Sequence, residues 1–312
     1  MVEMSPGRPV CIHRSSILLH LFSLQFIDYF GYPWYLLTEQ NLSLPFCSNK
    51  QSKQDGRLDS YFQRRDDKPM IELQNVTKIY NGTVRAVDNI TLTVKDGEIF
   101  GFLGPNGAGK TTTIKLIMGI LQADQGTIRV NGQDIATNSL EAKKQLGYAP
   151  DSPNMFLRLK GIEYLNFMAD MYDVSPEDRR TRIKDLSQRF QMADVLNDRI
   201  QSYSHGMRQK IVIIGVLLHN PSVWILDEPM TGLDPRSSFL LKEMMREHAD
   251  SGNTVFFSTH ILDVAEKVCD RVAIIDKGQI LFCGTMDEMK EHFRKNESLE
   301  KMFLELTENH EE

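Results

Sequence analysis

The stretch that decides the fold of this chain is Gly104-Pro105-Asn106-Gly107-Ala108-Gly109-Lys110-Thr111-Thr112. An apolar run at 99–103 precedes it and a helical pattern at 113–118 follows it, which gives the order strand, glycine-rich loop, helix. Glycines let the backbone wrap closely enough for its N–H groups to point at phosphate oxygens. The positive end of the following helix adds attraction for an anion. The pattern G-x-x-x-x-G-K-T therefore predicts a loop that holds the phosphates of a nucleotide.

Two side chains of this loop carry specific expectations. Lys110 is predicted to reach the β- and γ-phosphates, and the Thr111 hydroxyl is predicted to ligate Mg²⁺. The alternative is a glycine-rich turn that binds no ligand. Because the flanking strand and helix are those that such a loop requires, we favour the nucleotide site.

A second strand pattern ends in two acids. Residues 223–226 form a near-continuous apolar run, which suits a parallel strand covered on both faces, and Asp227 and Glu228 follow it. Ligands of open α/β sheets bind at the carboxyl ends of the strands. We therefore predict that Asp227 holds Mg²⁺, directly or through a water, and that Glu228 polarises or deprotonates the attacking water. The alternative is a chance pair of solvated carboxylates, which rarely follows such a strand.

Three other residues have both a functional and a structural interpretation. Ser204 is predicted to be the N-cap of a helix, which is either an ordinary cap or a second phosphate-binding end. His260 follows the apolar strand 254–258, where it either reaches the γ-phosphate or is a structural or surface histidine. Tyr80 precedes a turn and either stacks on a flat purine or is a surface or core tyrosine.

The pattern from residue 70 onward also predicts the elements around these residues. Residues 71–73 and 90–94 alternate apolar and polar, as half-buried antiparallel strands do, and hairpins are expected near 128–132 and 271–284. From 153 to about 200 the pattern is wholly helical, and Ser175, followed by a proline and two acids, predicts a helix start within it. The apolar positions of this helical stretch, up to Met171, are predicted to be core.

Length and composition set the class of protein. The chain has 312 residues, of which 41% are hydrophobic and 25% charged, and its formal net charge is −6. This length allows a proper core and one or two domains. The negative charge argues against broad electrostatic binding to nucleic acid. The four cysteines show neither a C-x-x-C pair nor metal-ligand spacing, so we predict free thiols in a reducing compartment.

The first 69 residues are a different kind of sequence. The most membrane-like window, 17–37, has Asp28 near its middle, and a central aspartate costs about 2.5–3.5 kcal/mol on insertion scales. Residues 48–69 have the polar and charged composition of a linker. We expect the extension 1–69 to be poorly ordered or not native, with Met70 as the natural start. Membrane contact by 17–37 stays open as the alternative.

Taken together, these motifs resemble the nucleotide-binding subunit of ATP-binding cassette (ABC) transporters over residues 70–307. In the family's order, the matching residues are Tyr80 at its adenine-stacking aromatic, Gly104 to Thr112 at its phosphate loop, Asp151 at its lid, Ser204, Gly206 and Met207 in its signature, Asp227 and Glu228 at its metal and catalytic acids, Asp234 at its dimer contact and His260 at its switch. Any one of these matches is a modest signal, whereas the ordered set is highly specific.

The resemblance implies a fold and a domain organisation. The implied fold is α/β, a P-loop NTPase (RecA-like) core with an antiparallel β subdomain and an inserted α-helical subdomain at about 153–218. The ATPase domain would span 70–307, and an acidic tail at 308–312 would follow it.

The resemblance also implies ligands, partners and roles. Two subunits, identical or different, would form a head-to-tail dimer that holds two ATP molecules with Mg²⁺, each between the phosphate loop of one subunit and Ser204 of the other. The implied roles are hydrolysis for Lys110, Glu228 and His260, and metal binding for Thr111, Asp151 and Asp227. The implied partner is a separate transmembrane permease subunit, which places the chain peripherally at the cytoplasmic face of the plasma membrane. No nucleic acid partner is expected.

Two departures from the family pattern bear on these expectations. Asp151 stands where glutamine or glutamate is usual, and its shorter reach favours a water bridge to the metal. The signature reads Tyr203-Ser204-His205-Gly206-Met207 in place of L-S-G-G-Q, and it retains the serine and glycine that carry the phosphate contact. The form Y-S-x-G-M resembles the exporter branch, which moves drugs, peptides or ions.

The predicted function is therefore an ATPase that powers a separate permease, as an exporter. The alternative is a soluble ABC ATPase that acts on ribosomes or nucleic acid. The single cassette and the lack of sustained heptads or a basic patch argue against that alternative. A GTPase or small-molecule kinase would leave Ser204 and His260 unexplained.

Overall fold

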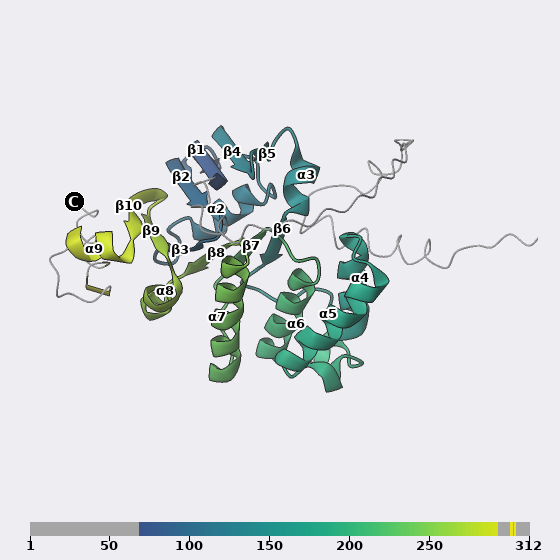
Figure 1. The fold of residues 1–312 in the computed structure, drawn as a ribbon. Coiled ribbons are helices and arrows are strands. Elements are labelled where there is room, and N and C mark those ends of the chain that lie inside the picture. Colours follow the sequence, from purple (N-terminus) through teal and green to yellow (C-terminus); the bar gives the residue numbers. More distant parts are fainter. Residues whose placement is uncertain (1–68, 293–299, 302, 304–312) are drawn as a thin grey trace, which may run out of the picture. The chain divides into compact units, whose positions relative to one another are not determined.

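The computed structural model describes residues 69–292, 300, 301 and 303 (Figure 1). The predicted extension 1–69, with the membrane-like window 17–37, lies outside the described residues apart from Pro69. The predicted domain end at 307 and the acidic tail 308–312 also lie outside them.

One sheet carries the predicted buried strands. In the part of the chain that the structure describes, six strands form this sheet in the order β10-β9-β3-β8-β7-β6. Their bounds are β3 (Ile99–Leu103), β6 (Leu146–Ala149), β7 (Val223–Asp227), β8 (Thr254–Thr259), β9 (Arg271–Asp276) and β10 (Gln279–Thr285). The strands from β9 to β6 are parallel, and β10 pairs antiparallel with β9 through the predicted closing hairpin.

A second sheet is antiparallel, with the order β2-β1-β4-β5. Its strands are β1 (Pro69–Tyr80), β2 (Val84–Lys95), β4 (Gln125–Val130) and β5 (Gln133–Asp134). The predicted antiparallel strands at 71–73 and 90–94 are confirmed as parts of β1 and β2, and both run longer than predicted. The two strands pair with each other, with Leu73 opposite Leu92. The predicted hairpin near 128–132 is confirmed by the pairing of β4 with β5.

The core lies on both faces of the six-stranded sheet, because successive side chains of a strand point to opposite faces. In β7, Val223 and Ile225 belong to a cluster that also contains residues of the antiparallel sheet and of α2. Trp224 and Leu226 belong to a second cluster with the helices that follow β6 and β7. Figure 1 shows these helices on one side of the sheet and the antiparallel sheet on the other. Burial on both faces explains the near-continuous apolar runs of the parallel strands.

Helices cover the faces and fill the insert between β6 and β7. The described helices are α2 (Lys110–Ile117), α3 (Ser139–Lys144), α4 (Gly161–Met171), α5 (Pro176–Arg189), α6 (His205–Leu217), α7 (Pro235–Asp250), α8 (Leu262–Val268) and α9 (Met286–His292), with 3₁₀ turns at Ala193–Val195 and Ile200–Ser202. Ser175 caps α5 by accepting a hydrogen bond from the Asp178 N–H at 3.1 Å, which confirms the predicted helix start. Among the described residues, no helix combines the length and the apolar character that crossing a membrane requires.

The prediction that 153 to about 200 is wholly helical is wrong for residues 153–160. Pro153 has no N–H to donate, and Phe156 has a left-handed backbone with φ of 53°, so a helix cannot run through this stretch. Its carbonyls accept hydrogen bonds from Ile200 and Gln201 N–H instead. Met171, predicted to be core, is 41% exposed, because α4 ends there.

We expect acid to destabilise this fold through two histidines, the buried His248 and the partly buried His219. The His219 ring stacks on Tyr172 with centroids 3.6 Å apart, and His248 packs edge-on against Trp224. Burial lowers the pKa of each imidazole from an ordinary value near 6.5 to about 4. Between these values the unfolded chain binds protons that the folded chain does not, so stability is lost as pH falls from 6.5 towards 4.

We expect each histidine to account for a loss of roughly 2 kcal/mol between pH 7 and pH 5. Urea unfolding at the two pH values measures this loss. The double substitution His219→Gln and His248→Gln should remove most of it. An equal loss in the wild type and the double variant would show that other groups cause the acid sensitivity.

Candidate functional site

Four of the predicted groups of site residues gather at one edge of the six-stranded sheet. The parallel strands β3, β6, β7 and β8 all present their carboxyl ends there, since parallel strands end at the same edge. The phosphate loop follows β3, Asp151 follows β6, Asp227 ends β7, and His260 follows β8. Residues that are far apart in the sequence are thereby brought to one place.

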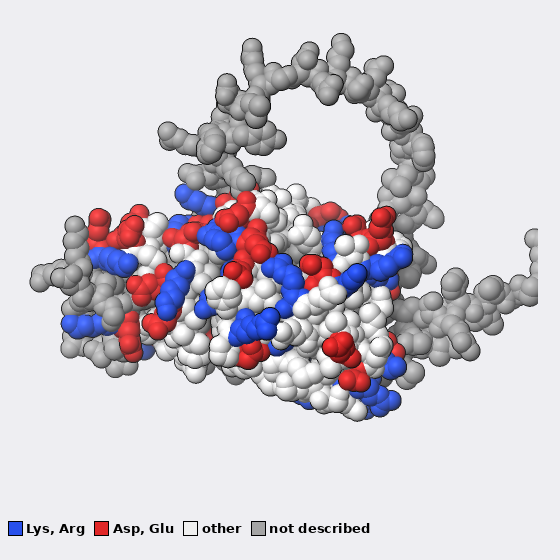
Figure 2. Space-filling view, turned by 60° about the horizontal axis from the view of Figure 1, so that its bottom comes forward, with Lys and Arg blue, Asp and Glu red and all other residues white. Residues whose placement is uncertain are grey.

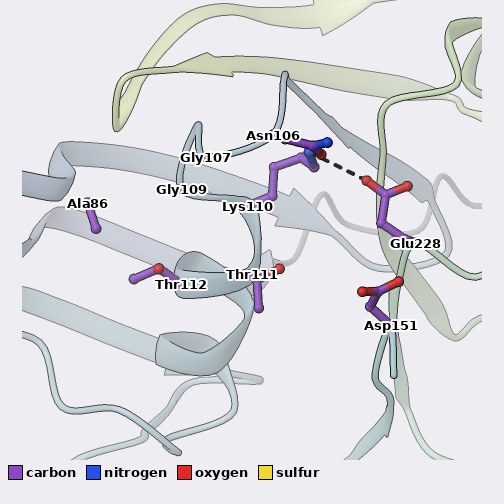
Figure 3. A pocket seen from close by; sticks show the side chains of 9 residues that line it. All are labelled: Ala86, Asn106, Gly107, Gly109, Lys110, Thr111, Thr112, Asp151 and Glu228. Atoms are coloured by element: carbon purple, nitrogen blue, oxygen red, sulfur yellow. Dashed lines mark ion pairs between the residues drawn. The ribbon is translucent and has the colours of Figure 1, made fainter. Parts of the chain in front are cut away.

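The phosphate loop closes over a hollow of about 210 Å³, shown in Figure 3. The hollow is lined by Ala86, Asn106, Gly107, Gly109, Lys110, Thr111, Thr112, Asp151 and Glu228. The loop itself is anchored from behind, because the Gly278 N–H of the β9–β10 turn donates to the Ala108 carbonyl at 2.9 Å. Gly104, Pro105 and Ala108 form this supporting side of the loop and do not line the hollow.

The glycines of the loop are required for two different reasons. Gly109 has φ of 110°, and a Cβ placed there would lie 2.3 Å from the carbonyl oxygen of Ala86 in β2. Gly107 has φ of 84° but open space around it. Gly109 therefore meets both backbone strain and a backbone clash on substitution, whereas Gly107 meets strain alone.

This difference predicts the stability of two alanine variants. Gly107→Ala should cost about 1 kcal/mol, the usual penalty of a left-handed non-glycine residue. Gly109→Ala should lower the free energy of unfolding by several times that amount, because β2 must also move away from the loop. Urea unfolding of both variants tests this, and equal losses would show that the approach of Ala86 has no energetic consequence.

Lys110 begins α2 with its ammonium folded back into the loop. Its Nζ donates to the carbonyls of Gly104 at 2.7 Å and Pro105 at 3.1 Å, and it lies 3.4 Å from Glu228 Oε1. The residue is only 6% exposed. Figure 3 shows the side chain pointing across the hollow towards Glu228. A phosphate in the hollow would thus meet a cation that is already partly desolvated.

Asp227 is buried and held by two hydroxyl groups. Thr111 Oγ1 donates to its Oδ2 at 2.9 Å, and Ser258 Oγ donates to its Oδ1 at 2.5 Å. Burial raises the pKa of Asp227, and the two hydroxyl hydrogen bonds oppose that shift by stabilising the charged form. The charges of Asp151 and Glu228 raise the pKa further. A cation beside Asp227 would oppose this shift, because an opposite charge favours the ionised carboxylate.

Glu228 lies between a lysine and a histidine. Its Oε2 is 2.9 Å from His260 Nδ1, while Oε1 faces Lys110 and accepts no hydrogen bond from the described residues. Its backbone is left-handed, with φ of 47°, a conformation that costs a non-glycine residue about 1 kcal/mol. The carboxylate thus presents one unsatisfied buried oxygen to the hollow, as a group that accepts a proton there would.

Tyr80 and Ala86 show a difference between the sequence prediction and the structure. Tyr80 ends β1, is 37% exposed and does not line the hollow. Ala86 of the neighbouring strand β2 does line it, and sequence reasoning missed this residue. The close approach of the Ala86 carbonyl to Gly109, which only the tertiary structure reveals, brings this residue to the phosphate loop.

The signature residues Ser204, Gly206 and Met207 form a second group, separate from the residues that line the hollow. Ser204 is the N-cap of α6 and accepts a hydrogen bond from Met207 N–H at 3.3 Å, which confirms the predicted cap. A Cβ on Gly206 would lie 2.6 Å from the Gly232 carbonyl, so the start of α6 packs tightly on the loop that leads to Asp234. None of these residues lines the hollow.

Asp234 connects the signature helix α6 with the start of α7. Its Oδ2 accepts hydrogen bonds from Lys210 Nζ at 2.9 Å and from Ser237 Oγ at 2.7 Å, and it caps α7. These hydrogen bonds, led by that from Ser237, hold the pKa of Asp234 well below its usual range. The carboxylate therefore already has partners within its own chain.

Comparison with known proteins agrees with this geometry. The family model described as ABC transporter matches residues 87–231. The ABC transporter ATP-binding protein NatA of Bacillus subtilis is 36% identical over 222 residues, which cover 71% of this chain and 90% of NatA. The daunorubicin/doxorubicin resistance ATP-binding protein DrrA of Streptomyces peucetius is 37% identical over 226 residues, which cover 72% of this chain and 68% of DrrA.

Solved structures of ATP-binding proteins are also similar to this chain. The structure of an ATP-binding subunit of an ABC transporter is 32% identical and superposes with a TM-score of 0.73, covering 76% of this chain and 99% of that one. The dimeric ATP-binding cassette MJ0796, solved with ADP and phosphate, shares the fold at 23% identity, with a TM-score of 0.63 over 70% of this chain and 99% of that one. The phosphate loop, the paired acids and these matches together show that this chain belongs to the ATP-binding subunits of the ABC transporter family.

Proposed function

We propose that this chain hydrolyses ATP as one half of a dimer and thereby powers a separate membrane permease that exports its substrate. The observation that supports the proposal is that the predicted site residues fall into two separate groups. The phosphate loop and Glu228 line one hollow, and Asp227 adjoins it through its hydrogen bond with Thr111, whereas the capped helix start at Ser204 lies outside it. A helix N-terminus without a ligand of its own chain is suited to a phosphate held by a second subunit.

The roles we propose follow from the contacts at the hollow. Lys110 moves from the loop carbonyls to the β- and γ-phosphates, which are stronger partners for an ammonium. Glu228 takes the proton of the attacking water, and His260 holds the carboxylate in place from the other side. Tyr80 and Asp234 are proposed to contact the nucleotide or the second subunit only once the dimer has formed.

Mg²⁺ is the proposed metal, and the residues present fit it. Asp227 and Thr111 are oxygen ligands of the kind that Mg²⁺ prefers, and Asp151 lines the same hollow. Among the described residues, no group of three or more His, Cys, Asp or Glu gathers to hold a metal. This suits an ion that takes its other ligands from phosphates and water. When bound, the ion would neutralise negative charge on the phosphates during hydrolysis.

The proposed permease partner and direction of transport rest on relatives. DrrA is named a resistance ATP-binding protein for daunorubicin and doxorubicin. LnrL of Bacillus subtilis, 34% identical over 220 residues that cover 70% of each chain, is named one for linearmycin. Both names favour export from the cell, and a permease would place this chain at the cytoplasmic face of the plasma membrane.

On the face of the described residues seen in Figure 2, acidic and basic side chains are interleaved.

A mixing experiment tests whether two subunits share each site. Lys110→Ala and Ser204→Ala should each abolish ATP hydrolysis alone. Mixed, they form dimers in which one site has both an intact phosphate loop and an intact serine, so hydrolysis should return. Ser202→Ala, which removes a nearby exposed hydroxyl, is the matched control and should hydrolyse ATP normally. If the mixture stays inactive, Ser204 does not act across a dimer.

A second experiment tests the partner. Affinity-tagged full-length chain from membranes of its native host should co-purify with a polytopic membrane protein. Recovery with ribosomes or nucleic acid instead would support the alternative function and contradict the transport proposal.

A further inference from the structure

We propose that Ser258 is a positioning residue that holds both acids of the site through a single hydroxyl group. Ser258 stands one residue before the end of β8, directly opposite Asp227 in the register of β7 with β8. It is fully buried, and no sequence motif assigned above includes it. The inference rests on the proposed function, because it concerns the residues proposed to hold Mg²⁺ and to activate water.

The Ser258 hydroxyl makes two hydrogen bonds, one as the donor and one as the acceptor. Ser258 Oγ donates to Asp227 Oδ1 at 2.5 Å and accepts from the Glu228 N–H at 3.1 Å. A hydroxyl is the side-chain group that donates and accepts at one atom, which is why an alanine or a valine cannot replace it here. The same atom therefore fixes the carboxylate of the first acid and the backbone of the second.

The hydrogen bond from Ser258 to Asp227 matters because the other residue that donates to this carboxylate, Thr111, has a second proposed role. Thr111 donates to Oδ2 in this structure, and Thr111 is also a proposed metal ligand. The oxygen of Thr111 would thus be shared between the carboxylate and the ion, whereas Ser258 holds the other carboxylate oxygen, Oδ1, and is not a proposed metal ligand. Groups that orient a metal ligand from behind typically contribute 10–100-fold to metal affinity or activity, as an order of magnitude.

The bond to Glu228 matters because that residue has a strained backbone. With φ of 47°, Glu228 keeps its conformation only if the surroundings hold it. Its N–H is shared between the carbonyl of Ser258 at 3.2 Å and the Ser258 hydroxyl at 3.1 Å. This anchored turn points the side chain at both Lys110 and His260.

The chain offers a matched control on the same strand. Thr254 lies four residues earlier in β8, so its side chain is on the same face of the sheet as that of Ser258. It is equally buried, and its hydroxyl donates to the Lys95 carbonyl at 2.9 Å, at the opposite end of the strand. Thr254→Ala thus removes a buried hydroxyl of the same strand without touching the site.

The test measures ATP binding by calorimetry in EDTA and across a Mg²⁺ titration, with full-length protein. Ser258→Ala should leave the affinity for ATP in EDTA unchanged, because the phosphate loop is intact. It should raise the Mg²⁺ concentration needed for half-maximal enhancement of binding by roughly 10- to 100-fold and lower kcat more than it raises KM. Ser258→Cys, with its weak donor, should resemble alanine, and Ser258→Thr should restore much of the wild-type response.

The outcomes separate the inference from the proposal that it rests on. If wild-type protein shows no dependence of ATP binding on Mg²⁺, the proposed metal site fails. If wild type depends on Mg²⁺ but Ser258→Ala responds as Thr254→Ala does, Ser258 is only a structural residue and the inference is overturned. Failure of Ser258→Thr to restore the response would likewise count against a role for the hydroxyl.

Discussion

Glu228→Gln should bind ATP as well as the wild type does but hydrolyse it about 10²–10⁴ times more slowly, the range that general-base catalysis usually contributes. Glutamine keeps the shape of the side chain and removes its ability to accept a proton. The buried oxygen that faces Lys110 without a hydrogen bond is the atom whose chemistry changes. Phosphate release by the purified variant measures turnover, and calorimetry measures ATP binding.

The same variant should accumulate as a dimer in Mg·ATP. Because closure of the proposed dimer depends on the γ-phosphate, a subunit that cannot cleave it stays in the closed state. Size-exclusion chromatography with and without nucleotide tests this expectation. Glu243→Gln, which changes an exposed glutamate on α7, is the control and should hydrolyse ATP at the wild-type rate. Full hydrolysis by Glu228→Gln would rule out this carboxylate as the base.

Lys110→Ala should fail at an earlier step, the binding of nucleotide. Hydrogen bonds from a charged group contribute about 1.5–3 kcal/mol, so the Kd for ATP should rise roughly 10- to 100-fold. The variant also leaves Glu228 without its nearby cation, which should lower stability in the absence of nucleotide. Calorimetric titration with ATP measures the affinity, and urea unfolding measures the stability.

Lys115→Ala is the matched control for this substitution. Lys115 belongs to the same helix and carries the same charge, but it does not line the hollow. It should bind ATP with nearly wild-type affinity. If both variants lose the same affinity, the effect of Lys110 arises from the net charge of α2 and not from contact with phosphate.

The local sequence pattern was sufficient to predict those features whose residues are all contiguous in the chain. The phosphate loop needs a strand, glycines at set positions and a helix start, and all three are contiguous in the chain. The Ser204 and Ser175 caps and the closing hairpin are local in the same way, and each was predicted correctly. At residues 153–160 the helical prediction was wrong, because the carbonyls of Leu157 and Leu159 accept hydrogen bonds from the distant residues Gln201 and Ile200.

What the sequence by itself determined is the nucleotide-binding class of this protein, because spacing within a short segment dictates whether a backbone can cradle phosphates. Only the tertiary structure decided which distant side chains share that cradle. The register of β7 with β8 brings Ser258 to Asp227, and the packing of β2 on the phosphate loop puts Ala86, and not Tyr80, at the hollow. Such neighbours depend on how strands line up across the sheet, and that register is set by burying the apolar side chains of several strands together, which no single stretch of sequence encodes.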